Sequence, residues 1–415
     1  MRHKAGDIMT TRPHILIINQ HGDNRGDEAA LRGMLVGLQN ELVLKAKFTI
    51  VHQIQDISAG QQIARDLDLD VCWIPMRISI YEYAGLVAYY TTGSKVLLGK
   101  HGLKTVKAFD AADLIISAPG GPYIGDLYSN HEAAHLLYIL LGRRSPAPKY
   151  LYAPSAGPFN KWWFNTLRRR AIRTFAKIGV REEVSASHLK KLFGEDQCCP
   201  PVEVFIDSAM QEQALPASRD SNRRLVAISA INWHYDNRGQ IDELRRNYDT
   251  SIASWCAELS KYGGTDFILV PQLHGTRHRD YPYLNHLSNV IRTMIGDSST
   301  VKVLDEETAM WDQRKLFAAA DFIFAGRYHP AVFGVSAGVP QTCVPYEHKA
   351  QGLMDKAGLS DMVIKMEDVS ATTLQNHASW LVTNEQRLRE RSMAAGAALH
   401  DVANEISRTA ISLMK

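Results

Sequence analysis

The amino-acid sequence predicts an α/β protein with two domains, each built on a mostly parallel sheet. Short apolar runs rich in β-branched residues alternate with helical patterns, as in parallel sheets covered by helices on both faces. The chain has 415 residues, more than the roughly 250 to 300 that one hydrophobic core accommodates. Pro200 and Pro201 interrupt the alternation, because proline neither continues a helix nor donates to a sheet ladder. We therefore expect the domain junction near residues 197–222.

The expected strands fall into two groups, one on each side of this junction. In the first half they are residues 14–19, 48–52, 71–74, 114–118, 150–153 and 178–181. In the second half they are residues 202–206, 225–229, 267–270, 301–304, 322–325 and 342–344. A long amphipathic helix is expected over 240–262, and helices again from 372 onward, after a last strand signal at 362–366. The expected parts are a flexible tail over 1–12, domains over 13–200 and 201–370, and terminal helices over 371–415.

The composition excludes several classes of protein. The contents of 45% hydrophobic and 22% charged residues are near the average for globular proteins. The 47 Lys and Arg residues against 44 Asp and Glu give a net charge of +3, too balanced for a nucleic-acid binder. The stretch at residues 317–326, which is apolar apart from Asp321, is shorter than the roughly 18 to 20 residues that span a bilayer. No apolar block of a secretory signal follows the N-terminus, so we expect a cytoplasmic protein.

Cysteine and histidine spacing does not predict a metal site. The five cysteines lack any C-x-x-C spacing, so we interpret them as ordinary reduced thiols. His274 and His278 are separated by four residues, as in some metal pairs, but the intervening Gly275 disfavours a helix and no third ligand is evident. No metal is therefore expected.

The first polar motif follows the strand expected at residues 14–19 and opens a helix. It contains Asn24, Gly26, Asp27 and Glu28, and Gly26 permits a tight turn and a close backbone approach. In one interpretation the two carboxylates only complement the dipole of the helix start. In the other, a carboxylate orients or deprotonates a substrate hydroxyl. The spacing is neither a dinucleotide fingerprint nor a P-loop.

Other strands of the first half also end in polar residues. Gly120 and Gly121 form a loop that lines a pocket or simply makes a turn, and Asp126 after them is a candidate acceptor for a sugar hydroxyl. Arg181 either faces the inter-domain cleft or pairs with a neighbouring glutamate. The basic run at residues 168–170, near two tryptophans, is interpreted as a solvated helix face, with contact to an anionic membrane surface as the alternative.

The second half places cations after its strands. Arg327 and His329 follow the strand at 322–325 and stand at a helix N-terminus, where an anion is favoured. Arginine supplies a bidentate fork, and histidine exchanges a proton near neutral pH. Lys349 follows the strand at 342–344 and is either a second charge for the anion or a solvated lysine. The loop with His274 and Arg277 is either a basic cleft wall or an exposed loop.

The order of these motifs resembles the polysaccharide pyruvyl transferase family. The matching segments are 24–29, Gly120-Gly121 with Asp126, 155–159, 179–182, 207–209, 326–329 and 339–349. The Arg-x-His element at 327–329 and the Tyr-x-x-Lys element from Tyr346 to Lys349 are the most telling. Departures from the family pattern are Pro122, Glu182 and the segment at 229–234, which lacks the usual arginine.

The resemblance implies a GT-B-like fold, with two Rossmann-like domains facing a cleft and C-terminal helices crossing back to the first domain. It also implies phosphoenolpyruvate as donor, a sugar of a glycan or of a lipid-linked precursor as acceptor, a pyruvate ketal as product, and no cofactor. The acceptor is then expected on the N-terminal domain and the donor on the C-terminal domain. On this reading Arg327 holds the anionic groups of the donor, and His329 acts as the acid or contacts the phosphate.

The residue chemistry is compatible with this reaction. The donor carries a carboxylate and a phosphate, and the cations expected to hold it follow strands. The expected catalytic residues are His329, Arg327 and Asp27, with the acid and base roles of His329 and Asp27 left open. The residues expected to bind substrate are Asn24, Gly26, Glu28, Gly120, Gly121, Asp126, Arg181, His274, Arg277, Tyr346 and Lys349. The alternatives are a metal-independent GT-B glycosyltransferase with a nucleotide-sugar donor and an anion- or sugar-binding protein without turnover.

Overall fold

The contacts within the chain define two compact units. The computed structural model describes residues 11–22, 24–54, 56–76, 78–127, 129–194, 198–213, 222–232, 241–274, 279–346 and 348–414. Unit 1 contains Met1–Gly22, Ala30–Gln211 and Val402–Lys415, and unit 2 contains Asp23–Ala29 and Glu212–Asp401. Most of the tail expected over 1–12 lies outside the described residues.

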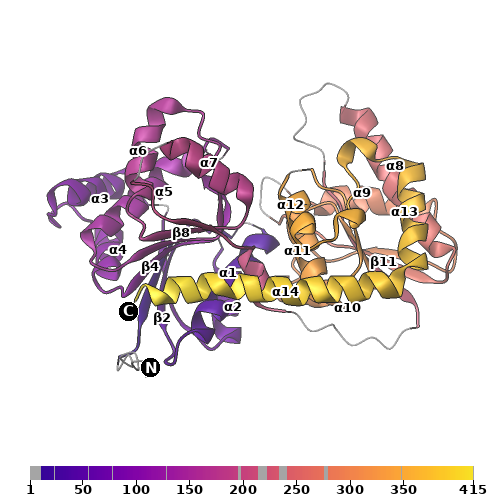
Figure 1. The fold of residues 1–415 in the computed structure, drawn as a ribbon, viewed down its shortest axis with the longest axis horizontal. Helices are drawn as coiled ribbons and strands as arrows, with labels where there is room; N and C mark the ends of the chain where they lie inside the picture. The colour runs from indigo at the N-terminus through magenta and orange to yellow at the C-terminus, as the bar shows by residue number, and fades with distance from the viewer. Residues whose placement is uncertain are drawn as a thin grey trace, which may run out of the picture. The chain divides into compact units, whose positions relative to one another are not determined.

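Unit 1 is built on a seven-stranded sheet whose neighbouring strands all run parallel (Figure 1). The order across the sheet is β3-β2-β1-β4-β6-β8-β9. The strands are β1 (His14–Gln20), β2 (Lys47–His52), β3 (Asp70–Pro75), β4 (Leu114–Ser117), β6 (Lys149–Tyr152), β8 (Lys177–Val180) and β9 (Val202–Val204). The central strands are buried on both faces, and Ile15 to Ile18 of β1 are at most 1% exposed, so these strands read as continuous apolar runs.

Helices surround this sheet, and a second, two-stranded sheet lies beside it. The helices are α1 (Arg25–Asn40), α2 (Ser58–Asp66), α3 (Ile80–Thr92), α4 (Lys100–Asp110), α5 (Ser129–Leu141), α6 (Trp162–Ile172) and α7 (Glu183–Phe193), with 3-10 turns η1 (Gly142–Arg144) and η2 (Ser208–Gln211). The small parallel sheet pairs β5 (Gly120–Ile124) with β7 (Pro154–Ala156). The first residues of α1, up to Ala29, are assigned to unit 2.

Unit 2 contains a five-stranded parallel sheet in the order β12-β11-β10-β13-β14. Its strands are β10 (Arg224–Ser229), β11 (Thr265–Leu269), β12 (Thr300–Val303), β13 (Phe322–Ala325) and β14 (Gln341–Cys343). Besides the first turn of α1, the helices that begin in this unit are α8 (Ile241–Ser260), α9 (Tyr281–Arg292), α10 (Met310–Ala319), α11 (Tyr328–Ala337), α12 (His348–Lys356), α13 (Ala371–Thr383) and α14 (Glu385–Ser412), with 3-10 turns η3 (Ser360–Met362) and η4 (Met366–Asp368).

Three expectations about the chain's organisation are corrected. The segment expected to begin the second domain, at 202–206, instead forms β9, which pairs with β8 and completes the sheet of unit 1. The strand signal at 362–366 gives only an isolated bridge between Val363 and Cys343 beside 3-10 turns. The terminal helices do not all join the first domain, because residues up to Asp401 belong to unit 2 and only Val402–Lys415 belong to unit 1.

Within each unit the order of the strands marks where a ligand is expected. In unit 1 the chain leaves β1 toward β2 and β3 on one side and later places β4 on the other side. In unit 2 the same reversal occurs between β10 and β13. In open parallel sheets, ligands bind at the carboxyl ends of the strands at such a switch point. Among the described residues, no helix is long and apolar enough to span a membrane.

Candidate functional site

The first polar motif of the chain is a structural part of unit 2. Asn24 forms an antiparallel bridge with Leu273, and the backbone N–H of Arg25 donates to the carbonyl of Gln272 at 3.1 Å. Asn24 also caps α1, since its Oδ1 accepts from the backbone N–H of Asp27 at 2.8 Å while its Nδ2 donates to Asp27 Oδ2 at 2.7 Å. The motif is therefore fixed both to the loop after β11 and to its own helix.

A buried ion pair anchors this segment. Arg25 Nη1 donates to both carboxylate oxygens of Glu28 at 3.0 Å, and its Nη2 donates to the carbonyl of Glu306 at 2.9 Å. Glu28 Oε1 also lies 3.2 Å from His274 Nε2, although this contact lacks hydrogen-bond alignment. Arg25 and Glu28 are only 6% and 4% exposed. Glu28 is thus committed to Arg25, a residue that sequence reasoning did not select, and this geometry favours an anchoring role.

Gly26 brings the first motif into contact with His329. A Cβ atom built on Gly26 would lie 1.9 Å from Nδ1 of the His329 ring, far inside van der Waals contact. Only glycine leaves this space, so the imidazole rests directly against the backbone of the first turn of α1. Two segments that lie far apart in the chain, both expected at the site, are therefore adjacent within unit 2. Asp27, on the same turn, is half-buried.

Arg327 lies at the switch point of unit 2 and is held by a carboxylate. It precedes α11 in an extended conformation, and its Nη2 donates to Asp280 Oδ1. The other oxygen, Asp280 Oδ2, accepts from the backbone N–H groups of Gln272 and Leu273, both at 3.0 Å. The Arg327 side chain is 12% exposed, and its Nε has no hydrogen-bond partner among the described residues. The guanidinium thus keeps donors that an anion can use.

Asp280 is a site residue that sequence reasoning missed. It is 2% exposed and links Arg327 to the same loop that bridges to Asn24. The available signal was its position, because it ends the polar loop after β11 and stands at the N-cap of α9. Close packing at the strand ends also restricts the segment before Arg327, since Gly326 leaves no room for a Cβ atom against the carbonyl of Ser229.

Tyr346 and Lys349 follow β14, the neighbour of β13, and so lie at the same edge of the sheet. Tyr346 is 39% exposed, and Lys349 is half-buried in the first turn of α12. Arg277 and His278 lie outside the described residues. In the part of the chain that the structure describes, no group of three His, Cys, Asp or Glu side chains could hold a metal ion.

The candidates of unit 1 are fixed by internal ion pairs. Burial alone would raise the pKa of Asp126, but hydrogen bonds from Arg168 and from the backbone N–H groups of Asn160 and Lys161 lower it. Arg168 also binds Glu132 through Nε and Nη2 at 2.8 and 2.7 Å. The interpretation of the run at 168–170 as a solvated face is therefore wrong for Arg168, whose side chain is fully buried.

Arg181 is likewise engaged inside unit 1. Its Nη1 donates to Asp207 at 2.6 Å and its Nε donates to Ser155 at 3.0 Å. Of the alternatives left open by the sequence, pairing is the one that the geometry favours, although the main partner is Asp207 and Glu182 lies at 3.9 Å. Gly120 and Gly121 belong to β5, and Gly120 has a φ of 140°, a conformation that favours glycine.

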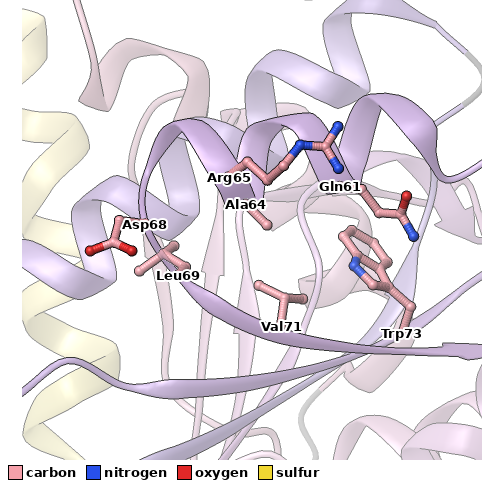
Figure 2. A pocket seen from close by; sticks show the side chains of 7 residues that line it. All are labelled: Gln61, Ala64, Arg65, Asp68, Leu69, Val71 and Trp73. Atoms are coloured by element: carbon pink, nitrogen blue, oxygen red, sulfur yellow. The ribbon is translucent and has the colours of Figure 1, made fainter.

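Unit 1 also has a surface hollow, whose lining side chains are drawn in Figure 2. It has a volume of about 420 Å³ and is lined by Gln61, Ala64, Arg65, Asp68, Leu69, Val71 and Trp73. These residues lie on α2, on the connection that follows it and on β3, an edge strand, rather than at the carboxyl ends of the central strands. None of the candidate residues named above lines this hollow.

Comparison with known proteins identifies the family. Residues 24–348 match the polysaccharide pyruvyl transferase family, a span that contains both segments meeting at Gly26 and His329. The chain belongs to this family. It is therefore a transferase of polysaccharide biosynthesis. One relative is the amylovoran biosynthesis protein AmsJ of Erwinia amylovora, 20% identical over 329 residues, which are 73% of this chain and 72% of AmsJ.

Solved structures confirm the GT-B-like fold expected for a polysaccharide pyruvyl transferase. A putative UDP-N-acetylglucosamine 2-epimerase from Listeria monocytogenes matches with a TM-score of 0.58 and 10% identity, covering 95% of this chain and 94% of its own. The UDP-GlcNAc 2-epimerase from Neisseria meningitidis matches with a TM-score of 0.55 and 13% identity, covering 96% of this chain and 100% of its own. MurG from Acinetobacter baumannii matches with a TM-score of 0.51 and 12% identity, covering 96% of this chain and 99% of its own. At these identities the likeness concerns the fold alone.

Proposed function

We propose that this transferase moves the pyruvyl group of phosphoenolpyruvate onto two hydroxyls of one sugar in a glycan or a lipid-linked precursor. The products are a cyclic pyruvate ketal and inorganic phosphate. The observation that carries the proposal is the contact between Gly26 and His329, at a sheet edge where Arg327 offers guanidinium donors. A proton-exchanging imidazole beside a cation suits an anionic donor that must be protonated.

The proposed reaction balances without a further reactant. A proton added to C3 of the enol makes C2 electrophilic, and the first sugar hydroxyl forms a bond to C2 and releases its proton. The bond from C2 to the phosphate oxygen then breaks, and the second hydroxyl replaces it. One hydroxyl proton compensates for the proton placed on C3, and the other leaves with phosphate. The protein must supply an acid, a base and stabilisation of the anion.

The residues of unit 2 divide these tasks. Arg327 and Lys349, after neighbouring strands, are proposed to hold the carboxylate and phosphate, because the N-terminus of α11 adds its dipole at the same point. His329 and Asp27, on first turns that meet through Gly26, are proposed as acid and base. Glu28 and Asn24 position this turn through Arg25 and the helix cap. Asp280 orients Arg327.

The test is phosphate release by the purified protein from phosphoenolpyruvate, in the presence of a panel of free and lipid-linked sugars. Phosphate release that depends on a sugar, together with a product that gains the mass of pyruvate minus water, supports the proposal. Turnover of nucleotide-sugars in place of phosphoenolpyruvate would identify a glycosyltransferase instead. Tight binding of both ligands without turnover would identify a binding protein.

Peripheral contact with an anionic membrane stays part of this proposal for a lipid-linked acceptor. Trp162 and Trp163 begin α6 and are 76% and 64% exposed, and large exposed aromatic side chains beside cations suit a membrane interface. Co-sedimentation with vesicles containing phosphatidylglycerol tests it. We expect binding to the vesicles to fall several-fold when both tryptophans are replaced by serine, in line with burial of their rings, while binding unchanged by these substitutions would contradict the contact.

A further inference from the structure

Three ring side chains form a cluster at the switch point of unit 1, apart from the residues assigned above. His21 follows β1, Tyr123 lies on β5 and His135 lies on α5. The centroid of the His21 ring is 4.9 Å from that of His135 and 5.3 Å from that of Tyr123, and the rings of Tyr123 and His135 are 5.1 Å apart. This is the edge of the parallel sheet where ligands are expected.

Two members of the cluster are fixed by hydrogen bonds. Asn19 has a φ of 63°, and its side chain donates to Ser117 Oγ at 3.0 Å and accepts from His135 Nδ1 at 3.1 Å. The proton of His135 is therefore on Nδ1, so its Nε2 is the acceptor end of the ring. Tyr123 donates to the carbonyl of Ala118 at 2.8 Å and lies 2.9 Å from Ser117 Oγ. These contacts make a rigid frame.

The third member, His21, is left with an unused polar atom. Its Nε2 is buried and has no hydrogen-bond partner among the described residues, although the residue as a whole is half-buried. Buried polar atoms in folded proteins normally have partners. A nitrogen left in this state at a switch point indicates a place where a ligand supplies the missing hydrogen bond.

The cluster carries no charge at neutral pH. Burial lowers the pKa of His21 to about 4 and that of His135 to about 2, with His131 adding in the same direction. Burial raises the pKa of Tyr123. The nearby Glu132 is paired with the fully buried Arg168. An anion or a cation would find no counter-charge among these rings, whereas hydroxyl groups suit an imidazole nitrogen and ring faces.

We propose that His21, Tyr123 and His135 form a binding site for a neutral sugar ring, in which a sugar hydroxyl hydrogen-bonds to His21 Nε2. The assignment of this sugar as the acceptor rests on the proposed function. Tyr123 and His135 are 2% and 1% exposed, so they back the site and fix its geometry, while His21, which is only half-buried, is the member that the sugar contacts. The site thus selects an uncharged substrate, while phosphoenolpyruvate is held in unit 2.

The proposal is tested by saturation-transfer NMR on the full chain, with the methyl glycosides of galactose, glucose and mannose as probes. The key variant is His21→Phe, which keeps a ring but removes both nitrogens. The matched control is His101→Phe, at an exposed position on α4 of the same unit. We expect binding of at least one glycoside to the wild type and to the control, and about tenfold weaker binding to His21→Phe, as for the loss of one hydrogen bond.

A further variant guards against misfolding. His21→Gln places an amide near the position of Nε2, and we expect it to bind more tightly than His21→Phe. Equal affinity of wild type and His21→Phe would overturn the proposal, as would the absence of glycoside binding to a wild type that binds phosphoenolpyruvate. Loss of glycoside binding in His21→Phe supports the sugar site whether or not phosphoenolpyruvate binds. Failure of phosphoenolpyruvate to bind counts against the proposed donor and not against the sugar site.

Discussion

The two sheets of this pyruvyl transferase place different chemistry at the same topological position. At the switch point of unit 1 the buried groups are neutral: an amide, a hydroxyl, a phenol and two imidazoles. At that of unit 2, Arg327 pairs with Asp280, and the Arg25–Glu28 ion pair anchors the segment that touches His329. Topology therefore indicates where a ligand is expected, and the side chains after the strands set the charge that a ligand would meet there.

The strongest test of this contrast removes the charged or proton-exchanging group of unit 2. We expect Arg327→Ala and His329→Ala each to reduce turnover of phosphoenolpyruvate by at least about 100-fold, as is typical when an anion-stabilising or acid-base group is lost. Steady-state phosphate release measures the effect. Lys302→Ala, at an exposed position on β12 of the same sheet, is the matched control. Near-wild-type rates in both variants would remove the functional distinction between the two sheet edges.

A smaller effect is expected from moving His329 without removing it. Gly26→Ala places a methyl group where the His329 ring lies, so the imidazole must shift or the first turn of α1 must move. We expect turnover to fall about tenfold or more, since misplacement of a catalytic group by an ångström has effects of this order. Gly296→Ala serves as control because a Cβ atom there meets nothing within 4 Å. Full activity of Gly26→Ala would show that the contact with His329 has no catalytic role.

We call the switch point of unit 2, with Arg327 and His329, the charged edge. Much of it could be predicted from the sequence. Arg327 and His329 directly follow an apolar strand and precede a helix, so local patterns alone place them at the edge of a sheet. Their contact with Gly26, which lies far away in the chain, was not predicted, because the order of motifs does not show which segments meet. Asp280 could not be predicted because its role depends on Arg327, a partner that lies far away in the sequence.

We call the switch point of unit 1, with Asn19, His21 and His135, the neutral edge. Neither this edge nor the buried Arg168 of unit 1 could be predicted in the same way. His135 stands in an apolar helix, and nothing near it in sequence indicates Asn19 or His21 as neighbours. Arg168 looks like part of a basic helix face, yet two carboxylates from other segments, Asp126 and Glu132, draw it into the interior. Tertiary pairing of this kind overrides the local preference of a charged residue for solvent.

The neutral edge also predicts a pH dependence of stability. Burial holds the pKa of His135 at about 2 and that of His21 at about 4, below the ordinary value of about 6.5. The unfolded chain therefore binds more protons below about pH 6.5, and each of these histidines destabilises the folded state by about 1.4 kcal/mol per pH unit between about pH 6.5 and its own folded-state pKa. The buried His377 of unit 2 acts in the same direction. Above about pH 7 these groups make no pH-dependent contribution.

Urea unfolding between about pH 7 and about pH 5 measures this dependence. We expect the fall in unfolding free energy to become shallower in His135→Gln, because one proton-binding difference is removed. His101→Gln, at an exposed position, should keep the wild-type slope. An unchanged slope in His135→Gln would mean that the neutral edge of unit 1 is neither as buried nor as uncharged as the structure indicates.

The smallest effect is expected at Cys343, which ends β14 just before the segment with Tyr346. Burial raises the pKa of its thiol to about 12, so the thiol stays protonated near neutral pH and is a poor nucleophile. Cys343→Ser should therefore change turnover by less than about twofold and lower the unfolding free energy by about 1 kcal/mol, because a hydroxyl replaces a thiol in an apolar setting. Parallel assays on Cys343→Ala separate loss of packing from loss of chemistry. A large drop in turnover in both variants, at unchanged stability, would show that the charged edge uses a thiol as well as a guanidinium and an imidazole.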